Sequence, residues 1–353
     1  MDSVVGAALG NGGLEKRSYD EFEDAEHLRI VVCGVGGGGN NCVNRLHKIG
    51  IGGAELIAAN TDKQDLQKLG DGITKILIGA KLMSGLGAGG FPELGAKAAE
   101  SSRPDLVEAL EGTHLLFLTA GMGGGTGTGA APVIAEVAKE AGAIVVAIVT
   151  FPFKLERARL VKAREGIEKL RQKADTVIII DNNKLVEYVP ELPIDKAFAV
   201  ADEIVARAVK GVTETIMEPS LINMDFADIR SILSGGGVSV ISVGEGEGTD
   251  RCDIAVKNTL AHPLLEIDYR EAKGALIHII GGPELTLGEA NRIGEALTSE
   301  FDSKASVMWG ARIDPRFHEK IEVIAIMTGI KSPDILGAQP PSEDGLLDDV
   351  KPT

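Results

Sequence analysis

Short apolar runs alternate with helix-like segments between Leu28 and Asp181. The runs are rich in β-branched and aliphatic side chains, which favour buried strands, whereas segments such as 132–142 (PVIAEVAKEAG) have helical spacing. Strands separated by helices lie parallel to one another, and a parallel sheet is covered by helices on both faces. The predicted strands are LRIVVCGV, ELIAANT, KILIG, HLLFLTAG, AIVVAIVTF and TVIIID. The fold class is therefore α/β, with a six-stranded parallel sheet in a Rossmann-like N-terminal domain.

A long amphipathic helix is predicted over 194–217. Apolar residues recur there every three or four positions, which gives one apolar stripe along about 36 Å of helix. The strands VSVISV, GALIHIIGG, SVMWGARI and IEVIAIMTG follow, with helices near 253–260 and 287–300 between them, and predict a C-terminal α/β domain with a four-stranded sheet. The predicted divisions are an acidic N-terminal extension (1–27), a nucleotide-binding domain (28–193), a central helix (194–217), a C-terminal domain (218–330) and a disordered tail (331–353).

Composition and charge narrow the class of protein. The 353 residues, 44% of them hydrophobic, provide for about two domains with real cores. The formal charge of −16 and the lack of a Lys/Arg cluster argue against a nucleic-acid partner. No apolar run approaches the roughly 18 residues of a membrane helix, and the first residues lack the basic start of a signal peptide, so we expect no direct membrane insertion. Cys33, Cys42 and Cys252 show no CxxC spacing and indicate a reduced, cytosolic protein.

The first predicted strand ends in GVGGGGNN (34–41), which contains a GxGxxG pattern and precedes a helix expected to open at about Asn41. Backbone amides at such a helix start can hold an anion, although a glycine-rich packing turn remains an alternative. A dinucleotide enzyme would have an acidic residue about twenty positions later, on the ribose. At that position the chain has Asn60-Thr61-Asp62, and Asp62 lies further along the sequence than a ribose-binding acid should. This weakens the alternative of an NAD-dependent Rossmann enzyme. No GxxxxGK[ST] motif is present.

A second glycine loop, GMGGGTGTG (121–129), follows the fourth predicted strand. Each glycine in place of alanine forgoes about 0.4–1 kcal/mol of stability, so a loop this rich in glycine indicates a backbone that touches a ligand. A tight strand-to-helix connection is the structural alternative. Two such loops at one sheet edge can hold a triphosphate from both sides, and LGAGG (86–90) adds a third loop for the γ-phosphate. We expect each loop to lie at the carboxyl end of a strand.

GGGTGTG (123–129) resembles the signature loop of the tubulin/FtsZ family of GTPases. GVGGGGNN, NTD, GLGAGG and NMDFAD occur in the order and spacing of that family, and the match covers 28–330. The resemblance implies that GTP and GDP are bound. Asn40-Asn41, where bacterial members commonly have Gly-Asn, suggests an archaeal member. The implied phosphate contacts are Gly36, Gly37, Gly38, Gly39, Asn40, Asn41, Ala88, Gly89, Gly90, Gly123, Gly124, Gly125, Thr126, Gly127, Thr128 and Gly129.

The same resemblance implies residues for the ribose and the base. Glu156 and an arginine would contact the ribose; the family usually shows E-G-x-x-R, and of the two arginines in ERAR we choose Arg159 over Arg157. Asn182, Phe198 and Asp202 resemble the base-recognition set. A carboxylate can accept hydrogen bonds from guanine N1–H and from its exocyclic amine, which favours GTP. Phe198 could equally be a core residue of the helix.

The segment NMDFAD (223–228) follows the long helix. On its own, Asp225 reads as the cap of a helix that includes Asp228. The resemblance implies instead a catalytic loop, Asn223, Asp225 and Asp228, whose carboxylates polarise the attacking water. The catalytic loop and the glycine loops would lie at opposite ends of the predicted helix, about 36 Å apart, so the catalytic loop would act on the nucleotide of a neighbouring subunit. Head-to-tail stacking then gives a filament, and hydrolysis is activated by polymerisation. Mg²⁺ would be held mainly by nucleotide phosphates and water, with Asp62 as a candidate contact and no metal-ligand cluster in the sequence.

The family further implies a homopolymer that forms the cell-division ring in the cytoplasm at mid-cell. A membrane-anchoring adaptor of the SepF type is expected as partner. Leu346-Leu347, flanked by acids in the tail, reads either as a short docking motif or as none. A scaffold that binds nucleotide without hydrolysing it is a further alternative, against which the Asp225/Asp228 pair argues.

Overall fold

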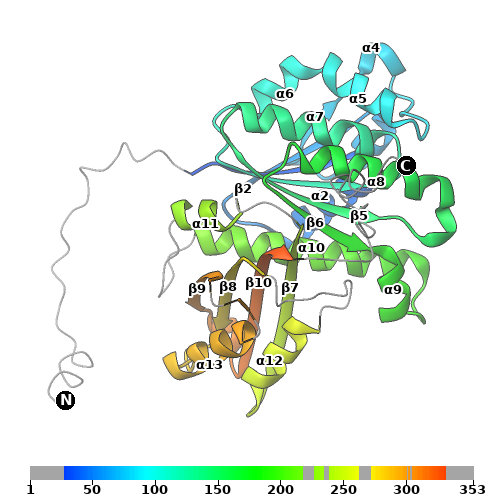
Figure 1. Cartoon of the computed structure of the whole chain (residues 1–353). Coiled ribbons are helices and arrows are strands. Elements are labelled where there is room, and N and C mark those ends of the chain that lie inside the picture. The colour runs from blue at the N-terminus through cyan, green and yellow to red at the C-terminus, as the bar shows by residue number, and fades with distance from the viewer. Residues whose placement is uncertain are drawn as a thin grey trace, which may run out of the picture.

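The computed structural model describes residues 28–217, 226–233, 238–261, 272–299, 301–302 and 304–330. Their strands form one sheet flanked by helices, with the N-terminal half above the C-terminal half in Figure 1. The strands are β1 Ile30–Val35, β2 Ala54–Asn60, β3 Thr74–Leu77, β4 Leu115–Gly121, β5 Ile144–Phe151, β6 Thr176–Asp181, β7 Val238–Glu247, β8 Gly274–Gly281, β9 Ser306–Ile313 and β10 Lys320–Ile330. The helices are α2 Gly36–Ile49, α3 Lys63–Gln67, α4 Ala80–Met83, α5 Pro92–Ser101, α6 Arg103–Leu110, α7 Thr126–Glu140, α8 Arg157–Arg171, α9 Asn182–Tyr188, α10 Ile194–Met217, α11 Phe226–Leu233, α12 Arg251–Leu260 and α13 Leu287–Thr298, with 3-10 turns η1 Lys154–Glu156 and η3 Pro315–Phe317.

The N-terminal half contains the six predicted strands in the order β3-β2-β1-β4-β5-β6, each parallel to its neighbours. Every residue of β1 and β6 is buried, as expected for strands covered on both faces. The predicted α/β fold with a six-stranded parallel sheet is confirmed.

The C-terminal half has the four expected strands, in the order β7-β10-β8-β9. β10 is antiparallel to both β7 and β8, whereas β8 and β9 are parallel. The six-stranded and the four-stranded sheet predicted from the sequence are joined at one edge. β6 and β7 pair in parallel at Val177–Val238 and Ile178–Ser239, which joins the two sheets into a continuous ten-stranded sheet.

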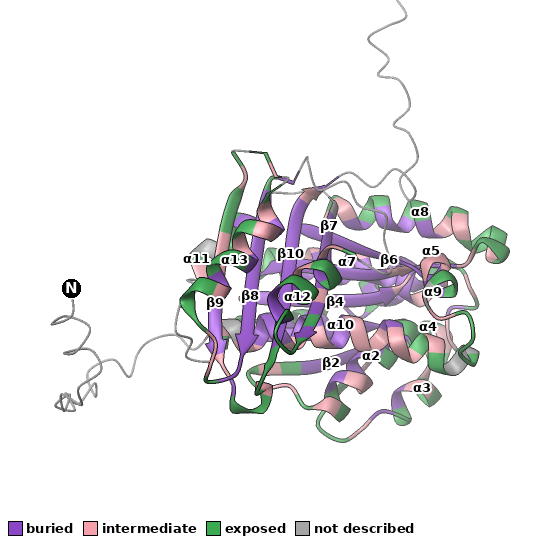
Figure 2. Ribbon diagram, turned by 90° about the horizontal axis from the view of Figure 1, so that it is seen from below, coloured by how far each residue is buried: buried purple, intermediate pink, exposed green. Residues whose placement is uncertain are grey.

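Helices cover both faces of this sheet, so the core has two layers (Figure 2). Because strand side chains alternate, Val31 and Cys33 of β1 point to the layer that contains α5, α6, α7, α8, α12 and α13. Ile30 and Val32 point to the opposite layer, formed with α2, α3, α9, α10 and α11. Cys33, Cys42 and Cys252 are buried and free. Within the described part of the chain, no helix has the length and apolar character needed to cross a membrane.

Helix α10 runs over Ile194–Met217, the residues expected for the central helix, and packs closely on the C-terminal sheet. A side chain at Gly211 would collide with Ile324 of β10, so glycine permits this approach. The domain boundaries 28–193 and 218–330 stay predictions. The predicted extension 1–27 and tail 331–353 lie outside the described residues.

Helix α2 begins at Gly36, not at about Asn41 as the glycine run suggested. Gly36 has φ +70°, so the chain turns sharply at the end of β1, and the glycines that follow it are already helical. A side chain at Gly39 would collide with the carbonyl oxygen of Thr119 in β4. Close packing of α2 on the sheet therefore outweighs the low helix propensity of glycine.

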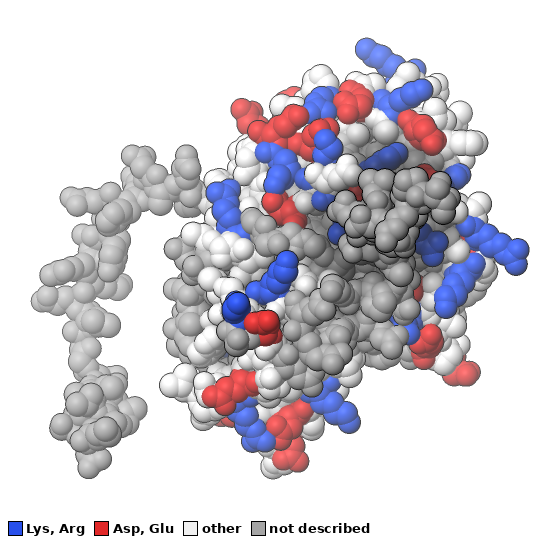
Figure 3. Space-filling view, viewed as in Figure 1, with Lys and Arg blue, Asp and Glu red and all other residues white. Residues whose placement is uncertain are grey.

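Acidic and basic side chains are interspersed on the face shown in Figure 3. Ion pairs link elements of the N-terminal half: Arg103 of α6 pairs with Glu140 of α7 at 2.7 Å, and Lys139 of α7 pairs with Asp175, which precedes β6, at 2.5 Å. An ion pair that remains accessible to solvent, such as Arg103–Glu140, contributes only about 0–1 kcal/mol, so the buried layers are the main source of stability.

Candidate nucleotide-binding site

Two glycine loops meet at the carboxyl edge of the sheet. A Cβ built on Gly36 would lie 2.9 Å from Gly127 N, and one on Gly38 would lie 3.3 Å from Gly121 N, so α2 and α7 begin side by side. Neither helix has a side-chain cap or an acidic residue in its first turn. The first N–H groups of a helix lack helical partners and carry positive partial charge. Two uncapped helix starts therefore form a cradle suited to phosphate oxygens.

The third loop, 88–90, lies at the same edge of the sheet, although it does not directly follow a strand as expected. It follows α4. Leu86 forms an antiparallel bridge with Asp62, just beyond β2, and Gly87 N donates to Thr61 O at 3.2 Å. A Cβ on Gly125 would lie 2.8 Å from Ala88 Cβ, so the third loop packs against the second. The three predicted glycine loops are thus brought together.

Buried polar side chains fix the backbone beneath the loops. With its amide oriented to suit its neighbours, Asn40 donates to Gly34 O at 3.0 Å and Gly36 O at 3.3 Å, and accepts from Asn60 Nδ2 at 3.0 Å. The side chain of Asn40 therefore supports the first loop from below. The hydroxyls of Thr61 and Thr126 are 2.6 Å apart and join the NTD turn to the second loop. These supporting contacts were not predicted, because Asn40 and Thr126 were expected to contact phosphate; the signal available in the sequence was Asn60-Thr61 at the end of an apolar strand.

Asp62 caps helix α3. Its Oδ1 accepts from Gln64 N at 2.8 Å and Asp65 N at 3.2 Å. This local role accounts for an acidic residue at this position, and the predicted contact with Mg²⁺ stays a prediction. Among the described residues, no group of three or more His, Cys, Asp or Glu could hold a metal ion.

The two ribose candidates lie beside the second loop. Glu156 Oε2 pairs with Arg159 Nη1 at 2.6 Å, and Glu156 Oε1 accepts from Phe153 N at 3.1 Å. Gly123, with φ +95°, approaches the Arg159 backbone so closely that a Cβ on it would lie 2.9 Å from Arg159 O. This contact favours Arg159 over Arg157 as the arginine near the nucleotide. Gly123 N also donates to Thr128 Oγ1 at 2.8 Å, so the Thr128 hydroxyl shapes the loop.

The base candidates include one buried acceptor without a partner and one carboxyl group whose pKa is raised by burial. Asn182 is 8% exposed, and its Oδ1 has no hydrogen-bond partner among the described residues. Burial raises the pKa of Asp202 to about 6, an effect that the nearby Arg45 opposes. Phe198 is 39% exposed and contacts Phe153 edge-on, with ring centroids 5.6 Å apart, so it is not a core residue. The unpaired acceptor of Asn182, the carboxyl group of Asp202 and the exposed ring of Phe198 suit a nucleotide base that carries N–H donors.

The predicted catalytic loop is only partly within the described structure. Asn223 and Asp225 lie outside the described residues, and Asp228 belongs to α11. Helices α9 and α11 lie near opposite ends of α10 in Figure 1, and the base candidates Asn182, Phe198 and Asp202 are at the α9 end. The 24 residues of α10 correspond to about 36 Å. The structure therefore does not bring Asp228 to the glycine loops of its own chain.

Fold and site together define a nucleotide-binding α/β protein with a phosphate cradle of glycine loops. Two family models match the chain: the Tubulin/FtsZ family, GTPase domain, over residues 29–190, and the FtsZ family, C-terminal domain, over residues 237–331. The chain belongs to the tubulin/FtsZ family and carries its GTPase domain, which binds GTP and GDP. The resemblance seen in the glycine loops is confirmed, and the NAD-dependent alternative is not favoured.

Similar proteins come from archaea. "Cell division protein FtsZ 2" of Methanocaldococcus jannaschii is 60% identical over 95% of this chain and 88% of its own length, and the protein of the same name from Haloferax volcanii is 50% identical over 96% and 85%. A solved structure, "FtsZ dimer, empty" from M. jannaschii, has a TM-score of 0.81 and 42% identity over 89% of this chain and 95% of that one. CetZ2 from H. volcanii, solved as a GTPγS-bound protofilament, is 23% identical with a TM-score of 0.74 over 88% and 95%, and shows a shared fold.

Proposed function

We propose that this protein is a GTP-hydrolysing cell-division protein that polymerises head to tail, with each active site completed by the neighbouring subunit. The observation that carries the proposal is a separation within one chain. Helix α2 lies along α10, with Arg45 on Glu203 and Ile49 O near Lys210, so the glycine cradle at the start of α2 is toward the start of α10, whereas the helix that contains Asp228 follows the end of α10. Relatives named as cell-division proteins, and relatives solved as a dimer and as a protofilament, support it.

In this proposal the amides of 36–41, 88–90 and 123–129 bind the phosphates, and Glu156 with Arg159 binds the ribose. Asn182 Oδ1 and the Asp202 carboxylate accept hydrogen bonds from guanine, and the Phe198 ring packs on the base. Adenine would leave both acceptors unpaired, which costs about 1–3 kcal/mol for each buried group. Mg²⁺, when bound between the β- and γ-phosphates, would neutralise charge that develops during phosphoryl transfer.

Hydrolysis requires a water molecule placed in line with the γ-phosphate. Asp225 and Asp228 of the next subunit, aided by Asn223, would orient and polarise that water. Phosphoryl transfer depends mainly on positioning and charge stabilisation, so two carboxylates brought by a neighbour are sufficient help. Because the two contacting surfaces differ, the contact does not close and extends into a filament.

The catalytic loop is tested by Asp225→Ala and Asp228→Ala. We expect GTP turnover to be lost, while the Kd for GTP and polymerisation followed by light scattering stay close to wild type. Asp105→Ala provides a matched control, because Asp105 is an exposed aspartate in the first turn of α6, away from the glycine loops. An equal loss of GTP binding in the loop variants would mean that the loop serves folding and not catalysis.

The cellular role follows from the same proposal. The filament would assemble in the cytoplasm at mid-cell, and an adaptor of the SepF type would link it to the membrane. A fluorescent fusion of the full chain should form a band at the division site, and Asp228→Ala should give bands that persist without constriction. Uniform fluorescence of the wild-type fusion in dividing cells would contradict this role.

A further inference from the structure

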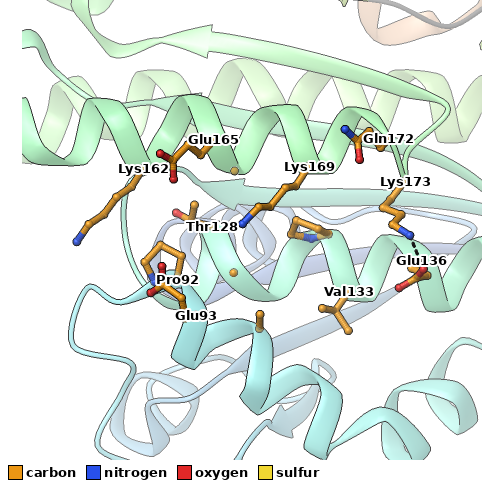
Figure 4. A pocket seen from close by; sticks show the side chains of 14 residues that line it. Pro92, Glu93, Thr128, Val133, Glu136, Lys162, Glu165, Lys169, Gln172 and Lys173 are labelled. Atoms are coloured by element: carbon orange, nitrogen blue, oxygen red, sulfur yellow. Dashed lines mark hydrogen bonds and ion pairs between the residues drawn. The ribbon is translucent and has the colours of Figure 1, made fainter.

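Lys162 of α8 contacts the third glycine loop. Its Nζ donates to Gly90 O at 2.8 Å and lies 5.4 Å from the ring centroid of Phe91. In Figure 4, Lys162 extends from α8 at the end of a cleft beside Pro92, the first residue of α5. A cation that makes both a charge-assisted hydrogen bond and a ring contact fixes the loop more firmly than either contact alone.

The backbone of this loop depends on contacts from other elements because its glycines have wide conformational freedom. Gly87, Gly89 and Gly90 have φ values of +83°, +56° and +80°, which only glycine adopts readily. The loop's own backbone hydrogen bond joins Phe91 N to Ala88 O at 3.0 Å. The Lys162 contact comes from a segment 72 residues away and ties the last residue of the loop to a rigid helix.

The same helix also contacts the second loop. Arg159, one turn before Lys162, packs against Gly123, and residues three apart lie on one face of a helix. One face of α8 thus spans both loops. These two contacts of α8 add to the direct packing of Gly125 on Ala88, which already joins the second and third loops.

We propose that Lys162 is a positioning residue that holds the 88–90 loop where it can contact a γ-phosphate, so that the site prefers GTP to GDP. The inference rests on the proposed function, in which this loop binds the γ-phosphate. Lys162 acts through the loop and does not touch the nucleotide. Holding a flexible loop in its bound position raises affinity because less conformational entropy is lost on binding.

The test compares Lys162→Met with a neighbour in the same cleft. Methionine keeps most of the apolar stem and removes the charge and the hydrogen bond. Lys169, two turns further along α8, also lines the cleft of about 230 Å³ and points into it in Figure 4. Its Nζ has no hydrogen-bond or ion-pair partner among the described residues, so Lys169→Met is the matched control. The Kd values of GTPγS and GDP are measured by calorimetry on the full chain.

We expect Lys162→Met to weaken GTPγS binding about 5- to 20-fold, as for loss of one charge-assisted hydrogen bond, and GDP binding less than about twofold. Lys162→Arg should restore most of the preference, and Lys169→Met should change neither Kd. An equal loss for both nucleotides, or an unchanged ratio of the two Kd values in a folded Lys162→Met protein, would overturn the inference. Failure of the wild-type protein to bind GTPγS would overturn the proposed function itself, and this inference with it.

Discussion

Asp202 and Asn182 are held in states that cost folding free energy. The Asn182 Oδ1 atom is buried without a partner in the described structure, and an unsatisfied buried acceptor costs about 1–3 kcal/mol. Burial of Asp202 disfavours its charged form. Both groups are acceptors in the form that we propose for guanine binding, so the nucleotide would supply the donors that the chain lacks. The cost explains why these residues are better assigned to binding than to the core.

Asp202→Asn should separate stability from binding. The folded-state pKa of Asp202 is about 6, above its ordinary value of 3.8. The folded protein therefore holds this proton more tightly than the unfolded chain, and the carboxyl lowers stability as pH rises from about 4 to about 6. At pH 7.5 the carboxyl is ionised in both states and its full destabilisation is present, so we expect the variant to be more stable without nucleotide by about 3 kcal/mol.

The same variant should bind GTP at least tenfold more weakly, because its amide offers donors where guanine also has donors. Wild-type affinity for GTP should fall as pH drops through 6, and the variant should lose this dependence. Urea unfolding and nucleotide titration between pH 5 and 8 provide the measurements. A less stable variant, or one with unchanged affinity, would contradict the assignment.

At the scale of elements, the glycine loops have a role in packing besides the nucleotide binding that we propose. Helix α7 lies so close to α5 that a side chain at Gly129 would collide with Pro92 O. Gly124, by contrast, has no heavy atom within 4 Å of the position its Cβ would take. Glycines of one motif thus differ in their surroundings: Gly129 permits a close backbone approach, whereas Gly124 borders open space that the proposed nucleotide would occupy.

Gly129→Ala should destabilise the protein by about 2–3 kcal/mol, because the added methyl forces α5 and α7 apart. Gly124→Ala is the matched control and should change the free energy of unfolding by less than about 0.5 kcal/mol. Both are measured by urea unfolding without nucleotide. Equal stabilities for the two variants would mean that the α5–α7 contact does not require glycine.

The strands were predictable because a buried parallel strand is apolar along its whole length, and the predicted helices 253–260 and 287–300 correspond to α12 Arg251–Leu260 and α13 Leu287–Thr298. The predicted start of α2 at about Asn41 was wrong. Helix propensity disfavours glycine in a helix, but the close contact of Gly39 with β4 leaves no room for a side chain and so requires glycine there. The Lys162–Gly90 contact was missed because a single lysine on an amphipathic helix gives no sign of a partner 72 positions away.

At the scale of the whole molecule, α10 connects the nucleotide site to the C-terminal sheet. Arg207 of α10 pairs with Glu322 of β10 and with Glu245 of β7. The short β6–β7 pairing extends the same sheet through both halves. If α10 moved where it lies beside the guanine base, its contacts would therefore move β7 and β10 of the C-terminal sheet as well. In the filament that we propose, this connection would link the nucleotide site to the contacts made by the C-terminal half.

The central claim is that each active site is shared between two subunits, and the rate of GTP hydrolysis per molecule against protein concentration tests it most directly. Light scattering on the same samples reports assembly. We expect turnover per molecule to be close to zero in dilute, monomeric protein and to rise together with scattering above a critical concentration. Full turnover per molecule in demonstrably monomeric protein would contradict the claim.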